Sequence, residues 1–139
     1  MTSTRKYLPT FADLIDRLSI CQLKQIFLSE HKETYTKEIS DIIHDLNLII
    51  KEKEITINGK MIRQILMIML TNRYIWENES KARKGKTQDL LLLKHTHSIN
   101  GVRNNAKNII SQEIGEKIDL KIDCMAADLP KEFGNWKII

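Results

Sequence analysis

Four polar side chains recur at helical intervals in the middle of the chain. Asn72, Trp76, Glu79 and Arg83 stand at i, i+4, i+7 and i+11. A helix through residues 61–84 would therefore carry them along one side. They supply an amide, an indole, a carboxylate and a guanidinium, which can hydrogen-bond a polar ligand and stack on a planar one.

A second polar stripe follows further along the chain. His97, Asn100, Asn104 and Lys107 recur at three- and four-residue intervals, and Arg103 stands beside Asn104. Arg103 and Lys107 carry positive charge at neutral pH and can bind a phosphate or another anion. His97 adds an imidazole to this stripe, which can donate or accept a hydrogen bond.

The two stripes are expected to face each other. Only Gly85 to Thr87 separates the two predicted helices, and so short a connection makes them an antiparallel hairpin. Counting outward from the turn brings Asn72 near Asn100 and Trp76 near His97. The predicted ligand-binding residues are those of both stripes: Asn72, Trp76, Glu79, Arg83, His97, Asn100, Arg103, Asn104 and Lys107.

Two interpretations of the facing stripes stay open. Buried polar groups must be paired, so the stripes can form a hydrogen-bond network that fixes the register of the helices. Alternatively, they line a cleft that receives a nucleotide-like or phosphorylated small molecule. No metal or cofactor is expected, because His95 and His97 point in different directions on a helix and no carboxylate or cysteine stands at ligand spacing.

Three functions follow from these interpretations. The preferred one is a small cytoplasmic binding protein, not an enzyme, that sequesters a phosphate-bearing small molecule. An enzyme acting on a nucleotide or an activated sugar would use Glu79 or Asp89 as base and His97 as acid. A protein-interaction module that inhibits another protein would need an exposed apolar patch, for which the candidate is residues 131–139, with Trp136.

The first helix has a recognisable start. Thr10 followed by Asp13 is a variant of the capping box, and an apolar band through about Leu28 predicts a helix over residues 11–30. Asp13, Arg17 and Lys24 lie along its polar edge, where we expect ion pairs within the helix.

A second helix is predicted after a polar connector over residues 30–35. Thr34 or Thr36 would cap it, and apolar residues keep helical spacing as far as Ile50. His44 falls on the solvent side of this helix and is interpreted as a surface histidine.

The central helix is predicted after a short break. Residues 55–57 are β-branched and favour an extended corner or a very short strand, and Asn58 can cap the helix that follows. Residues 65–70 are apolar on every side, which predicts that this helix lies in the middle of the domain. Gly85 would end it.

A fourth helix is expected from Thr87 to Gly115. Beyond it, residues 118–122 alternate apolar and charged side chains, which favours either a strand paired with residues 55–57 or an irregular segment packed over the helices. The predicted fold is thus an all-α antiparallel bundle of four main helices with a short C-terminal extension and at most a minimal β-pair, in a single domain over residues 1–139.

The composition agrees with a helical domain and excludes some partners. The chain has only 2 prolines and 5 glycines, which favours long helices. Its 22 basic and 18 acidic residues are interspersed, so a nucleic-acid partner is not expected. No apolar run reaches the roughly 18 residues that a membrane span needs. Two distant cysteines without a signal peptide indicate a cytoplasmic protein, and the surplus of apolar helix surface favours a homo-oligomer.

Parts of three predicted helices also resemble a known family. The run Leu14-Ile-Asp-Arg-Leu-Ser-Ile20, followed by Leu23-Lys24, is similar to the opening of a family of small helical proteins from bacteria and phages whose activity is not settled. The similarity continues at Trp76, Glu79, Arg83, Asp89, Lys94, Asn100, Arg103, Asn104 and Ile109. The family carries an acidic residue and an Asn-Gln-Arg-type run where this chain has His97-Ser-Ile-Asn-Gly-Val-Arg-Asn104. The resemblance implies kinship with these small helical proteins and no particular activity. A phage accessory or anti-defence factor is one form that the preferred binding function would take.

Overall fold

The computed structural model describes residues 8–84 and 90–116, with side chains described for residues 8–80 and 94–116. This part of the chain is helical and contains no strand, so the prediction of an all-α fold with four main helices is confirmed. The elements are α1 (Phe11–Phe27), one 3-10 turn η1 (Ser29–His31), α2 (Lys32–Glu52), α3 (Gly59–Lys84) and α4 (Leu90–Ile114).

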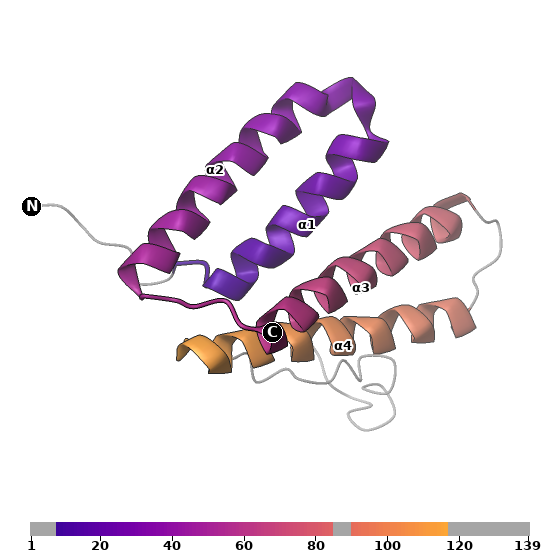
Figure 1. Ribbon diagram of the computed structural model, residues 1–139. Coiled ribbons are helices and arrows are strands. Elements are labelled where there is room, and N and C mark those ends of the chain that lie inside the picture. Colours follow the sequence, from indigo (N-terminus) through magenta and orange to yellow (C-terminus); the bar gives the residue numbers. More distant parts are fainter. Residues whose placement is uncertain (1–7, 85–89, 117–139) are drawn as a thin grey trace, which may run out of the picture.

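The helices pack in two pairs, α1 with α2 and α3 with α4. Figure 1 shows α1 lying between α2 and the α3–α4 pair, and α1 contacts both α3 and α4. Because α1 touches every other helix, it is the element through which the two pairs are held together. None of the described helices combines the length and the apolarity needed to cross a bilayer.

The hydrophobic core lies where the first half of α1 meets α3 and α4. Two of its side chains, Ile68 and Ile110, are 0% exposed. From α2, only Ile42 is buried, because this helix packs on α1 and leaves its other sides to solvent. The buried core residues are Phe11, Ala12, Ile15, Met61, Ile68, Ala106 and Ile110.

Three helix ends follow the predictions from local sequence. The Thr10 hydroxyl accepts a hydrogen bond from the Asp13 N–H, and the Asp13 carboxylate accepts one from the Thr10 N–H, each at 3.1 Å. The Asn58 side chain accepts a hydrogen bond from the Met61 N–H at 2.9 Å, which satisfies a free amide at the start of α3. Gly115 adopts φ +73° directly after α4, a conformation that favours glycine.

One buried carboxylate, that of Glu116, joins the ends of three helices. The Glu116 side chain, 8% exposed, accepts a hydrogen bond from the Phe11 N–H and pairs with Lys53 Nζ, both at 2.8 Å. A negative charge at the N-terminus of α1 is favourable because that end of a helix is electropositive. Glu116 therefore connects the end of α4 to the start of α1 and the end of α2.

The structure corrects the predicted start of α2 and decides between the alternatives for residues 55–57. Helix α2 begins at Lys32 and not after Tyr35, because the 3-10 turn over 29–31 already reverses the chain; the Thr36 hydroxyl, expected as a cap, donates to the Lys32 carbonyl inside the helix at 2.8 Å. Of the two alternatives for residues 55–57, the strand is wrong, because these residues form an irregular connection between α2 and α3. The paired strand at 118–122, the turn over 85–87 and the start of α4 at Thr87 lie outside the described residues.

The prediction that α3 lies in the middle of the domain is wrong for one side of the helix. Met61 and Ile68 are buried against α1 and α4, as expected. Ile62, Leu66 and Leu70 are instead 50%, 64% and 63% exposed. The described helices α1 and α4 pack against one side of α3, and these apolar residues on its other side stay exposed.

Candidate functional site

A polar cluster lies at the junction of α1, α3 and α4. Its centre is Asn72 of α3, which is 4% exposed. The Asn72 Nδ2 group donates to Asp16 Oδ1 at 2.7 Å and to Ser19 Oγ at 2.5 Å, and its Oδ1 accepts from Arg103 Nη1 at 2.9 Å. One amide thus uses both its donors and its acceptor to join three helices.

Lys107 extends this cluster with ion pairs. Its Nζ lies 2.9 Å from Asp13 Oδ1 and 3.5 Å from Asp16 Oδ2. The sequence predicted ion pairs within α1 for this polar edge, and that prediction is wrong: Asp13 pairs with α4, while Arg17 pairs with Glu38 of α2 at 2.9 Å. We call Asp13, Asp16, Ser19, Asn72, Arg103 and Lys107 the junction cluster.

The charges of the junction cluster balance each other. Two carboxylates, Asp13 and Asp16, face two cations, Arg103 and Lys107. Partial burial raises the pKa of Asp13, but the hydrogen bonds from Lys107 and Thr10 and the charge of Lys107 outweigh it, so the pKa lies below its ordinary value. Asp13 is therefore ionised at neutral pH, and both Lys107 and the start of α1 depend on that charge.

Two buried donors, one of them in the junction cluster, have no hydrogen-bond partner among the described residues. They are Arg103 Nε and Asn78 Nδ2, and Asn78 is 5% exposed. An unpaired buried donor costs free energy. The Arg103 guanidinium is thus held by Asn72 through one nitrogen while a second nitrogen keeps its capacity to donate.

The structure brings three of the predicted ligand-binding residues together, namely Asn72, Arg103 and Lys107. The predicted register is close to the observed one, since Asn72 contacts Arg103 where Asn100, one turn away, was expected. The same residues meet Asp13, Asp16 and Ser19 of α1, which the sequence analysis missed. Their spacing on α1 does carry a signal, because Asp16 stands four residues after the buried Ala12 and Ser19 four residues after the buried Ile15.

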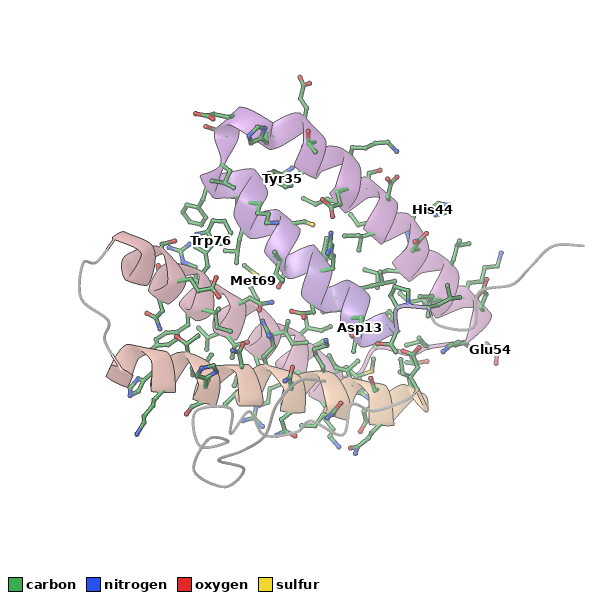
Figure 2. All side chains as sticks on the ribbon, turned by 180° about the vertical axis from the view of Figure 1, so that it is seen from behind. Asp13, Tyr35, His44, Glu54, Met69 and Trp76 are labelled. Atoms are coloured by element: carbon green, nitrogen blue, oxygen red, sulfur yellow. The ribbon has the colours of Figure 1, made fainter. Side chains whose placement is uncertain are left out.

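The other predicted residues lie apart from this centre or outside the described side chains. Figure 2 shows Trp76 on the side of α3 that faces the C-terminal half of α1. Glu79 is exposed, and His97, Asn100 and Asn104 are half-buried on α4. Arg83 and Asp89 fall in the part of the chain whose side chains are not described.

A second feature is the apolar side of α3. Ile62, Leu66, Leu70 and Tyr74 recur every four residues and are 36–64% exposed. We call these four residues the α3 outer face. It is bordered toward α4 by the contact of Tyr74 Oη with His95 Nδ1 at 3.4 Å.

The other border of the α3 outer face lies toward α1. There the Arg73 guanidinium lies over the ring of Phe27, 4.4 Å from its centre, and pairs with Glu77 at 2.8 Å. Phe27 is itself 46% exposed and continues the apolar surface onto the end of α1. The exposed apolar surface therefore spans two helices.

The described residues offer little for metal or thiol chemistry. Within residues 8–84 and 90–116 no three His, Cys, Asp or Glu side chains are grouped as a metal site requires. Cys21 is 2% exposed, and burial, followed by the charge of Glu38, raises the pKa of its thiol. A buried neutral thiol is a poor nucleophile.

Comparisons with protein-family models, with curated protein sequences and with solved structures found no match. The resemblance to a family of small helical proteins from bacteria and phages stays a prediction.

Proposed function

We propose that this protein is a protein-interaction module that binds through the α3 outer face. The observation that supports this proposal is the exposure of Ile62, Leu66 and Leu70 at 50%, 64% and 63% on consecutive turns of one helix. Monomeric soluble proteins expose single apolar residues everywhere, but contiguous apolar patches commonly mark binding surfaces.

The position of the patch fits binding by a helix face. A regular row of apolar side chains at four-residue spacing is the pattern that packs against another helix or into a groove. Arg73 and Glu77 add a polar edge to the α3 outer face, and protein interfaces usually have such a polar rim. The apolar patch that the sequence analysis expected in residues 131–139 lies outside the described residues, so the proposal depends on α3 alone.

Site-specific photo-crosslinking tests this proposal. A photoreactive amino acid is introduced at Leu66, and at Asp41 of α2 as a matched control, because Asp41 is also exposed in the middle of a helix. We expect a covalent adduct heavier than the 16.2-kDa chain from position 66, none from position 41, and its loss in the Leu70→Glu variant. No adduct from position 66, or equal adducts from both positions, would overturn the proposal.

A second candidate function is the binding of a phosphate-bearing small molecule at the junction cluster. One observation favours it: Arg103 Nε is buried and makes no hydrogen bond. A guanidinium with an unused donor is suited to receive an oxygen of a phosphate. The carboxylates of Asp13 and Asp16 weigh against it, because an anion would have to displace them from Lys107.

Thermal-shift measurements separate this second function from a structural role of the cluster. The probes are inorganic phosphate, pyrophosphate and a panel of nucleotides and cyclic oligonucleotides. Binding predicts a concentration-dependent rise in Tm that disappears in Arg103→Ala. No shift with any anion, or a shift that survives Arg103→Ala, would reject it.

A further inference from the structure

We infer that the partner of the α3 outer face is a second copy of this chain, bound through an antiparallel pairing of the two α3 helices about a two-fold axis at Leu70. This inference rests on the proposed function and names its partner. It is drawn from the order of charges along the exposed side of α3, where Arg63 precedes Leu66, Leu70 and Tyr74, and Glu77 follows them. Ile62 lies just outside this symmetric stretch.

The spacing of these charges is symmetric about Leu70. Arg63 stands seven residues before Leu70 and Glu77 seven residues after it, and seven residues are close to two turns of a helix. All three residues therefore lie along the same side of α3. Leu66 and Tyr74 stand four residues before and after Leu70, so the apolar pair has the same symmetry as the charges.

A two-fold axis at Leu70 turns this symmetry into complementary contacts. In a closed dimer the same patch occurs on both subunits, and a residue that contacts its counterpart is contacted by it in return. Antiparallel helices about this axis place Leu70 against the second Leu70, and Leu66 against Tyr74 of the other copy. Arg63 then faces Glu77 of the other copy at both ends of the contact, which gives two ion pairs.

Other pairings of the same surface bring like charges together. Parallel helices would place Arg63 against Arg63 and Glu77 against Glu77. An antiparallel pair centred midway between Leu66 and Leu70 would place Arg63 against Arg73. Like charges directly opposed at an interface are unfavourable, so the axis at Leu70 is the arrangement that the charges select.

The charges involved are accessible to a second copy. Arg63 is exposed, and among the described side chains it has no ion-pair partner. The Glu77 side chain is 47% exposed, and its pairing with Arg73 leaves part of the carboxylate open to a second cation. Arg73 also stacks on Phe27, at the border of the α3 outer face toward α1.

The size of the surface sets the strength of the dimer. Residues 63–77 span about 21 Å of helix, and a helix with its side chains is about 10 Å wide. That is a small interface compared with the roughly 800 Å² that each partner buries in a standard one. The dimer is therefore a reversible one whose population depends on concentration.

Sedimentation equilibrium of the full chain with charge reversals tests the inference. Arg63→Glu and Glu77→Arg each replace two attractions with two repulsions, so each is expected to weaken dimerisation about tenfold. The double variant restores opposite charges and is expected to dimerise within about threefold of the wild type. Lys37→Glu on α2 is the control, because it removes an exposed i,i+4 ion pair like that of Arg73 with Glu77. It is expected to leave dimerisation unchanged.

The double variant separates the loss of the ion pair between two copies from the loss of the bond to Arg73 within one copy. If Glu77→Arg weakened the dimer only by breaking the bond to Arg73, the double variant would be as weak as the single one. A chain that is monomeric at every concentration overturns the inference, and so does a dimer that ignores both reversals. In either case a photo-crosslink from Leu66 to a different protein leaves the proposed function standing, whereas no crosslink at all overturns both.

Discussion

Arg103 of α4 donates a hydrogen bond to Asn72 of α3 at 2.9 Å, and Asn72 in turn donates one to Asp16 of α1 at 2.7 Å. This relay fixes the position of α1 on the α3–α4 pair with directional bonds, in a region where apolar contacts alone would allow sliding. Directional contacts of this kind favour one packing over its alternatives.

Replacing Asn72 by alanine is expected to lower the free energy of unfolding by about 1–3 kcal/mol, because it leaves Asp16, Ser19 and Arg103 without their buried partner. Urea unfolding followed by circular dichroism measures the change. Asn47→Ala, at an exposed position of α2, is the control and should stay within about 0.5 kcal/mol of the wild type. Equal effects of the two substitutions would refute the role of Asn72.

The ion pair of Asp13 with Lys107 predicts a loss of stability in acid. The pKa of Asp13 is lower in the folded protein than its ordinary value of 3.8. The unfolded chain therefore takes up the proton first as the pH falls. The stability that Asp13 contributes is complete above its unfolded pKa and is lost as the pH drops through the folded pKa.

Thermal unfolding between about pH 6 and pH 2.5 checks this sign. Asp13→Asn is expected to be less stable than the wild type at neutral pH, with a difference that shrinks toward the acid end. Asp41→Asn, in an exposed pair on α2, should follow the wild-type curve. A constant difference between Asp13→Asn and the wild type at all pH values would contradict the prediction.

Glu116 offers a test of how the helix ends are joined. Glu116→Ala removes the acceptor of the Phe11 N–H and the partner of Lys53, and is expected to cost about 1–3 kcal/mol of unfolding free energy. Glu113→Ala is the matched control, since Glu113 pairs with Lys60 closer to solvent. If both substitutions cost the same in chemical denaturation, the buried carboxylate has no special part in joining the ends.

Local sequence sufficed to predict three helix ends. The capping residues Thr10 and Asn58 and the glycine at position 115 act within a few residues of themselves, so their effect can be recognised without knowing the fold. The start of α2 could not be predicted this way. A 3-10 turn ended the connection early, and no side chain caps the helix.

The contacts between helices were harder to predict. Asp16 and Asn72 are 56 positions apart in the chain, and nothing local indicates that they meet. The spacing of Asp13 and Arg17 suits an ion pair within α1. In the structure Asp13 pairs instead with Lys107 of α4, and Arg17 pairs with Glu38 of α2. Competition between near and distant partners of the same charge is decided by the packing of the helices.

The α3 outer face shows a second limit of sequence analysis. A helix that is apolar on every side indicates burial on every side, but periodicity does not say which molecule supplies the cover. Among the described residues, Ile68 is 0% exposed and Leu66 is 64% exposed. The same pattern therefore fits a core helix and a helix whose remaining side is covered by a partner.

Substitutions at Ile68 and Leu66 test the central claim, that the α3 outer face serves binding and not the folding of the single chain. Ile68→Ala is expected to cost about 2–5 kcal/mol of unfolding free energy. Leu66→Glu, measured at a concentration where the chain is monomeric, should change it by no more than about 0.5 kcal/mol and should abolish the adduct formed by a photoreactive group at position 62. A Leu66→Glu chain destabilised as much as Ile68→Ala, or one that keeps the adduct, would contradict the claim.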